Sequence, residues 1–179
     1  MNRKTIINIH LYLAALFAPI ILLMSVSGGL YLFGYKGGYE KELVTRVDAV
    51  SINAKSKTLK QDVQNLLAQN GVEIEFEYVK VKKNDFYTRP TNRMHYLLRN
   101  KSDSVEIIRV QPDFIASIVE LHKGHGPIAF KWLEKILAFV LVIVMLTGVW
   151  LGIKSPALRM PTLASLGAGG LVVLLLALI

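Results

Sequence analysis

Three long apolar runs dominate the chain, and one polar segment separates the first run from the other two. The runs cover residues 6–33, 130–153 and 163–179. They are apolar on all sides, whereas a helix on a soluble protein keeps a polar face. About 20 apolar residues span a bilayer, so the first two runs are long enough and the third is close to the minimum. The pattern therefore predicts three transmembrane helices.

A cleaved signal peptide is the alternative for the first run, because Arg3 and Lys4 precede it as a basic pair. The run is about twice as long as the apolar part of a signal peptide, and no small-residue cleavage site follows it. We expect an uncleaved membrane anchor.

The polar segment between the first two runs contains the pattern of one amphipathic helix. Residues 58–69 have apolar side chains at helical spacing. Thr58 and Gln61 have the spacing of an N-terminal capping box, and Asn70-Gly71 is a good helix stop. We predict a helix over these residues.

Strand patterns follow this helix. Residues 72–78 alternate strictly between apolar and polar. The phase changes at Tyr78-Val79, which indicates a bulge, and the alternation then continues through Val81. Residues 94–99 and 105–110 form two further predicted strands, joined by a turn at 100–103. One helix packed on a small antiparallel sheet is the expected result.

The predicted fold is therefore an α-helical membrane protein with three transmembrane helices. A small α+β extracytoplasmic domain lies between the first two. The expected parts are an N-terminal tail with the first helix (1–35), the domain (36–121), the second helix (122–154), and a short cytoplasmic loop with the third helix (155–179).

The net charge of +8 does not indicate nucleic-acid binding. Residues 36–123 carry 15 basic and 12 acidic side chains, and most of the remaining excess lies beside the apolar runs. Basic residues in short segments mark the cytoplasmic side. Arg3 and Lys4, together with Lys154 and Arg159, therefore predict a cytoplasmic N-terminus and an outward-facing domain. The lipid bilayer is one expected partner.

The absence of cysteine excludes thiolate metal sites and iron–sulfur clusters. The sequence also shows no nucleophile–base set, phosphate-binding loop or paired carboxylates. Glu73, Glu75 and Glu77 are interpreted as the solvent-exposed face of a strand.

Histidines at the ends of the first two runs are the main candidates for chemistry. His10 lies near the start of the first run, and His122 and His125 lie just before the second. Polar, ionisable side chains in a membrane are costly and often functional. The other end of each run carries a glycine signature, Ser27-Gly28-Gly29 in the first and Thr147-Gly148 in the second.

Together these features resemble the PepSY-associated transmembrane family. The resemblance rests on the basic pair Arg3-Lys4, on His10 and Ser27-Gly28, on the α+β module, and on a second set of motifs: His122, Gly126, Thr147-Gly148 and Trp150. It implies a multi-pass protein of the bacterial inner membrane with a periplasmic domain. Larger members resemble membrane haem proteins that pass electrons outward, some of which reduce ferric siderophores.

The resemblance implies haem b as a cofactor, with His10 and His122 as haem-iron ligands. His125, Gly28 and Gly148 are further candidate cofactor-binding residues. The alternatives remain open. His10 is equally an interfacial histidine, while His122 and His125 form a polar turn or bind a metal directly. Glycines also serve simple helix packing. His95, in a predicted strand, is expected at the surface.

The helices predicted from the first two runs cross the membrane in opposite directions. Each histidine should therefore lie at the same membrane level as a glycine of the other helix. His10 should face Gly148, and His122 or His125 should face Gly28 and Gly29. The two levels are separated by roughly 20 residues, or about 30 Å, so they cannot share one haem. Each haem would need a second ligand from another copy or subunit.

The third run contains small residues, including Ser165 and Gly169, whose spacing favours close helix contact. We therefore expect a homo-oligomer or a complex with other membrane subunits. The favoured function is a haem-b-associated subunit of a transmembrane electron-transfer or iron-reduction system. The alternative is a non-catalytic accessory or assembly subunit of a larger membrane complex.

Overall fold

The computed structural model describes residues 2–101 and 103–179. Contacts divide the chain into two units. One contains the residues up to Ile21 together with Lys135–Ile179, and the other is Leu22–Glu134.

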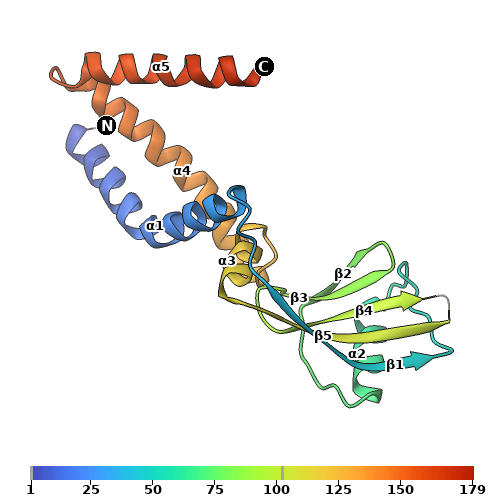
Figure 1. The fold of residues 1–179 in the computed structure, drawn as a ribbon. Coiled ribbons are helices and arrows are strands. Elements are labelled where there is room, and N and C mark those ends of the chain that lie inside the picture. The colour runs from blue at the N-terminus through green and yellow to red at the C-terminus, as the bar shows by residue number, and fades with distance from the viewer. Residues whose placement is uncertain (1, 102) are drawn as a thin grey trace. The chain divides into compact units, whose positions relative to one another are not determined.

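Three long helices follow the apolar runs: α1 (Arg3–Leu32), α4 (Ile128–Lys154) and α5 (Arg159–Ala177) (Figure 1). Among the described residues, these are the helices long and apolar enough to cross a membrane. Most of their apolar side chains are exposed in the single chain, as expected for helices that face lipid or another protein. The three predicted apolar helices are confirmed, and α5 begins earlier than its apolar run.

The polar segment forms a sheet built from β1 (Tyr39–Asp48), β2 (Tyr78–Lys82), β3 (Asp85–Arg89), β4 (His95–Lys101) and β5 (Ser104–Pro112). The order is β1-β5-β4-β3-β2, and every neighbouring pair is antiparallel. The predicted hairpin is confirmed as β4 and β5. Its strands extend to Lys101 and Ser104, and Ser102 of the predicted turn lies outside the described residues.

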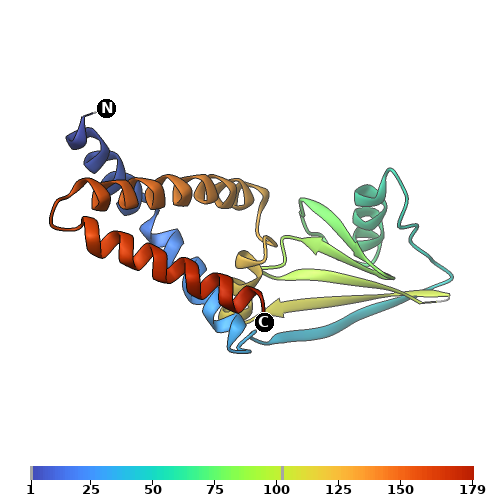
Figure 2. The same ribbon diagram turned by 90° about the horizontal axis from the view of Figure 1, so that it is seen from above.

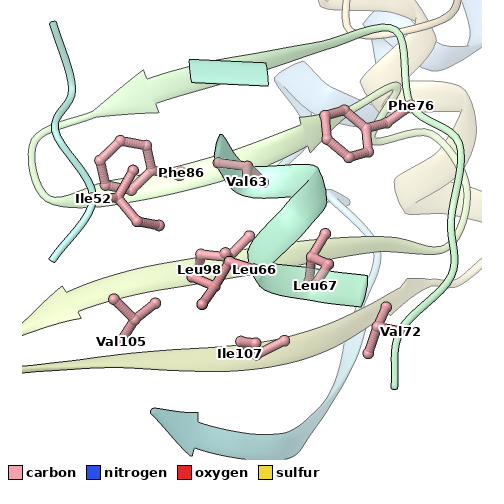
Figure 3. Packing of buried hydrophobic residues seen from close by; sticks show 10 residues of the cluster. All are labelled: Ile52, Val63, Leu66, Leu67, Val72, Phe76, Phe86, Leu98, Val105 and Ile107. Carbon is pink, nitrogen blue, oxygen red and sulfur yellow. The ribbon is translucent and has the colours of Figure 1, made fainter. Parts of the chain in front are cut away.

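Helix α2 (Leu59–Gln69) packs on one face of this sheet (Figures 1 and 2). The core lies between them, where side chains from α2 meet alternate residues of the strands (Figure 3). Its members are Ile52, Val63, Leu66, Leu67, Val72, Phe76, Phe86, Leu98, Val105 and Ile107. The predicted α+β domain is thus confirmed in its layers.

The strand predicted from residue 72 through Val81 is correct only in its last part, because pairing starts at Tyr78. Val72 and Phe76 are buried while Glu73 and Glu75 are exposed. The alternation therefore arises because one side of this segment packs against the core, although the segment pairs with no strand. The phase change at Tyr78 marks the start of β2, which pairs regularly, and the irregularity of register lies in β1 between Leu43 and Thr45.

The predicted capping box is also wrong. Thr58 makes no side-chain cap hydrogen bond, and its hydroxyl donates to Asp62 instead. The sequence did not predict α3 (Phe114–His122), which contains the boundary expected at residue 121. Asp113 caps α3 by accepting the N–H of Ala116 at 2.7 Å, and it also accepts the N–H of Gly38 at 2.6 Å.

Candidate functional site

His10 projects from α1 onto the backbone of α4. A Cβ built on Gly148 would lie 3.2 Å from Cε1 of the His10 ring. The absence of a side chain at Gly148 therefore lets the imidazole approach α4 closely. Next to it, Nδ1 of His10 lies 3.0 Å from Oγ1 of Thr147.

The hydrogen bonds of Thr147 favour one tautomer of His10. Oγ1 of Thr147 lies 2.7 Å from the carbonyl oxygen of Ile143 and 3.0 Å from that of Val144. A hydroxyl has one proton, which goes to these carbonyls, so its oxygen accepts from the Nδ1–H of His10. In the neutral ring, Nε2 then carries the free lone pair.

His122 makes the corresponding contact at the other end of α1. A Cβ on Gly28 would lie 2.8 Å from Cε1, 3.3 Å from Nε2 and 3.5 Å from Nδ1 of His122. The side of the ring that carries both nitrogens therefore occupies the space that a side chain at Gly28 would need. Nothing lies within 4 Å of the corresponding point on Gly29. The predicted pairing of His10 with Gly148 is confirmed. Of the two candidates for Gly28 and Gly29, His122 contacts Gly28, and the predicted contact at Gly29 is wrong.

His125 belongs to a different site, a buried network around Glu120 of α3. Oε2 of Glu120 accepts from Nδ1 of His125 at 2.8 Å and from the hydroxyl of Thr91 at 2.7 Å. Oε1 accepts from Lys123 at 2.5 Å and from the hydroxyl of Tyr39 at 3.1 Å. The carboxylate thereby joins the loop that precedes α4 to the sheet.

Arg89 completes this network from the end of β3. Its Nη1 donates to the hydroxyl of Thr91 at 2.6 Å and lies 3.7 Å from Oε2 of Glu120. Both charged side chains are about 8% exposed, so each would be costly to bury without the other.

The environment of Glu120 sets its protonation. Burial alone would raise the pKa of the carboxyl, but hydrogen bonds from His125, Lys123 and Thr91 outweigh it and hold the pKa well below its usual range. Glu120 is therefore ionised at neutral pH. The same carboxylate, together with burial, raises the pKa of the Tyr39 hydroxyl, which stays protonated as a donor.

A comparison with known protein families shows which family the chain belongs to. The family model described as PepSY_TM-like matches residues 3–179. The chain belongs to the PepSY_TM-like family. Neither a comparison with curated proteins nor one with solved structures gave a match.

The histidines of this PepSY_TM-like protein differ in how well they suit a haem. His10 fits an axial ligand, because Nδ1 is fixed by Thr147 and Nε2 is free to bind iron. The ring of His122 lies in the space that a side chain at Gly28 would need, with Cε1 nearest. In the described part of the chain, no group of three or more His, Cys, Asp or Glu side chains could hold a metal ion.

His95 is buried in the PepSY_TM-like domain, so the predicted surface position is wrong. It is 4% exposed, and its Nδ1 lies 2.9 Å from the carbonyl oxygen of Arg93. Burial lowers the pKa of His95, which favours the neutral ring. Alternation along 94–99 could have predicted this, since His95 shares a strand face with the buried Leu97.

Sequence reasoning missed Glu120, Arg89 and Thr91. The available signal was one acidic residue in a stretch, residues 115–121, that is otherwise apolar except for Ser117. Glu77 was interpreted as solvent-exposed, but Oε2 of Glu77 accepts the N–H of Ile128 at 2.8 Å. It therefore caps the first turn of α4, where an anion also suits the helix dipole.

Proposed function

We propose that this chain is a membrane subunit of a transmembrane electron-transfer or iron (ferric siderophore) reduction system in the bacterial inner membrane. In this proposal His10 provides one axial ligand to a haem b. The hydrogen bond between His10 and Thr147 is the observation that carries it. The charges near the helix ends support an orientation with a cytoplasmic N-terminus and an extracytoplasmic domain.

The support comes from how a ligand histidine is prepared. Metal-bound imidazoles usually donate their second ring nitrogen to an oxygen, which fixes the ring and its tautomer. Thr147 supplies such an oxygen to Nδ1, and its own proton is already used by the α4 backbone. A bound haem would supply one-electron redox chemistry, and the protein would hold and orient the ligand.

The proposal requires a second ligand from outside the chain. A haem b with two axial histidines needs one besides His10, and the ring of His122 lies against Gly28. We therefore propose that the second histidine comes from another copy or from another subunit. Most apolar side chains of α5 are exposed in the single chain, which leaves surface for such an assembly.

The test is an optical spectrum of the protein purified from haem-replete cells, compared with three variants. His10→Ala should abolish the Soret band. Thr147→Val should weaken haem binding about 10–100-fold, the usual effect of losing the group that orients a ligand. Thr147→Ser keeps the hydroxyl and should retain the band. A colourless wild type, or an unchanged His10→Ala spectrum, would refute the proposal.

A second candidate is a non-catalytic accessory or assembly subunit. The observation in its favour is that each imidazole already fills the space above a glycine, so both contacts join helices without any cofactor. This candidate predicts a colourless protein that purifies only with partners. In that case His10→Ala would reduce assembly or stability and leave no spectroscopic signal to lose.

A further inference from the structure

The sheet has a second face, opposite α2, that carries a cavity of about 440 Å³. Figure 2 shows α2 on the other face of the sheet. The cavity floor is apolar and comes from the three inner strands: Tyr87 of β3, Leu97 of β4 and Val110 of β5. This volume lies in the range of small-molecule sites, about 300–1,000 Å³.

The walls of the cavity are strongly basic. Its lining includes six cationic side chains and one carboxylate, that of Glu120. The cationic residues are Lys41, Lys80, Lys82, Arg89, Arg99 and Lys123. Arg89 and Lys123 pair with Glu120, and Arg99 pairs with Asp85.

The side chains of the remaining three lysines have no hydrogen bond or ion pair within the described residues. Lys41 belongs to the edge strand β1, and Lys80 and Lys82 belong to the opposite edge strand β2. Strands are about 4.8 Å apart, so these edges are roughly 19 Å from each other, with the apolar floor between them. Long lysine side chains can reach inward from both sides.

Arg89 contributes a further cation to the wall of this cavity. The residue is 7% exposed, and its Nε is buried without a hydrogen-bond partner among the described residues. Because that nitrogen has almost no surface open to solvent, a ligand in the cavity would meet the positive charge of Arg89 and not its Nε–H.

We propose that this cavity binds a small organic anion, in which a carboxylate, sulfonate or phosphate is attached to an apolar or aromatic body. The body would lie on Tyr87 and Leu97, and the anionic group would pair with the free lysines and Arg89. The lining excludes a cationic ligand by repulsion, and the apolar floor disfavours a small inorganic anion. This inference does not depend on haem binding.

The test uses the full chain in nanodiscs of zwitterionic phosphatidylcholine, with 2-naphthoate and octanoate as probes and ligand-detected NMR as the readout. Uncharged 2-naphthamide is the matched ligand control. Lys41→Glu/Lys80→Glu reverses one lysine on each edge. Lys55→Glu/Lys57→Glu makes the same charge change at exposed positions outside the cavity.

At least one anion should bind with a dissociation constant below about 1 mM. The cavity double variant should weaken binding at least about tenfold, while the control variant should change it less than about twofold. Three results would overturn the proposal: no binding of either anion, equal binding of 2-naphthamide, or equal losses in both variants. If this face of the sheet is shielded from solvent only in nanodiscs that contain anionic phosphatidylglycerol, the face binds a lipid surface. That result would also overturn the proposal.

Discussion

Replacing Glu120 by Gln tests whether the buried carboxylate holds the domain together. The change keeps the size of the side chain and removes its charge. Hydrogen bonds from His125, Thr91, Lys123 and Tyr39 then meet an amide, whose nitrogen cannot accept them.

The loss of stability in Glu120→Gln follows from the charge of Arg89, which remains buried in the variant. Arg89 stays buried at about 8% exposure and loses its counterion. Removing one partner of a buried ion pair costs about 3–5 kcal/mol, and because one oxygen remains as an acceptor we expect about 3 kcal/mol. That is a large part of the 5–15 kcal/mol typical of a folded domain.

Hydrogen–deuterium exchange of the full chain in detergent measures this loss locally. Amides of β4 lie in the centre of the sheet, and their protection reports opening of the domain. Glu120→Gln should reduce that protection by the equivalent of about 3 kcal/mol. Glu73→Gln is the matched control, since Glu73 is exposed, and it should leave protection unchanged. Equal protection in both variants would refute the role assigned to Glu120.

The pH dependence provides an independent check on the same residue. The folded protein holds the pKa of Glu120 below its ordinary value of 4.5. Its contribution is therefore complete above about pH 4.5 and is lost as the pH falls further, because the unfolded chain takes up the proton first. The wild type should lose protection in this acid range, and Glu120→Gln should lose less. A wild type and variant with parallel acid profiles would contradict the assignment.

Three further predictions concern the helices. Gly28→Ala should destabilise the protein by about 1–3 kcal/mol in thermal unfolding, because its Cβ would lie 2.8 Å from the imidazole of His122. The control Gly29→Ala should be neutral, and equal effects of the two variants would disprove the contact. Gly169→Leu should weaken oligomers or hetero-complexes in mild detergent without preventing insertion, and normal assembly would refute a contact through α5. Lys57→Cys should react with an impermeant thiol reagent on spheroplasts and Ser155→Cys should not; the reverse pattern would invert the proposed orientation.

The sequence predicted those parts of the fold that have a strong local pattern. Uniform apolar runs predicted α1, α4 and α5, and helical spacing predicted α2. β1 was missed because most of its residues are exposed on an edge strand, so burial imposes little alternation there. The segment 72–77 shows the opposite error, with alternation from packing but no strand partner.

The candidate site was predictable where it depends on the order of motifs along antiparallel helices. Counting residues along the two runs was enough to pair His10 with Gly148, but it did not decide between His122 and His125 as the partner of Gly28. The Glu120 network was not predictable in this way. Its partner Arg89 is 31 positions away along the chain, and the contact depends on how β3 and α3 meet in the folded domain.

The central claim is that His10 is an axial ligand of a haem shared with a partner. The most direct measurement is the haem content per polypeptide, by the pyridine haemochromogen method, of the complex purified under mild conditions. The account predicts haem b in the wild type, at about one haem per two copies if the partner is a second copy. It also predicts loss of this haem in His10→Ala while the complex stays assembled. A haem-free wild-type complex, or full haem content in His10→Ala, would contradict the claim.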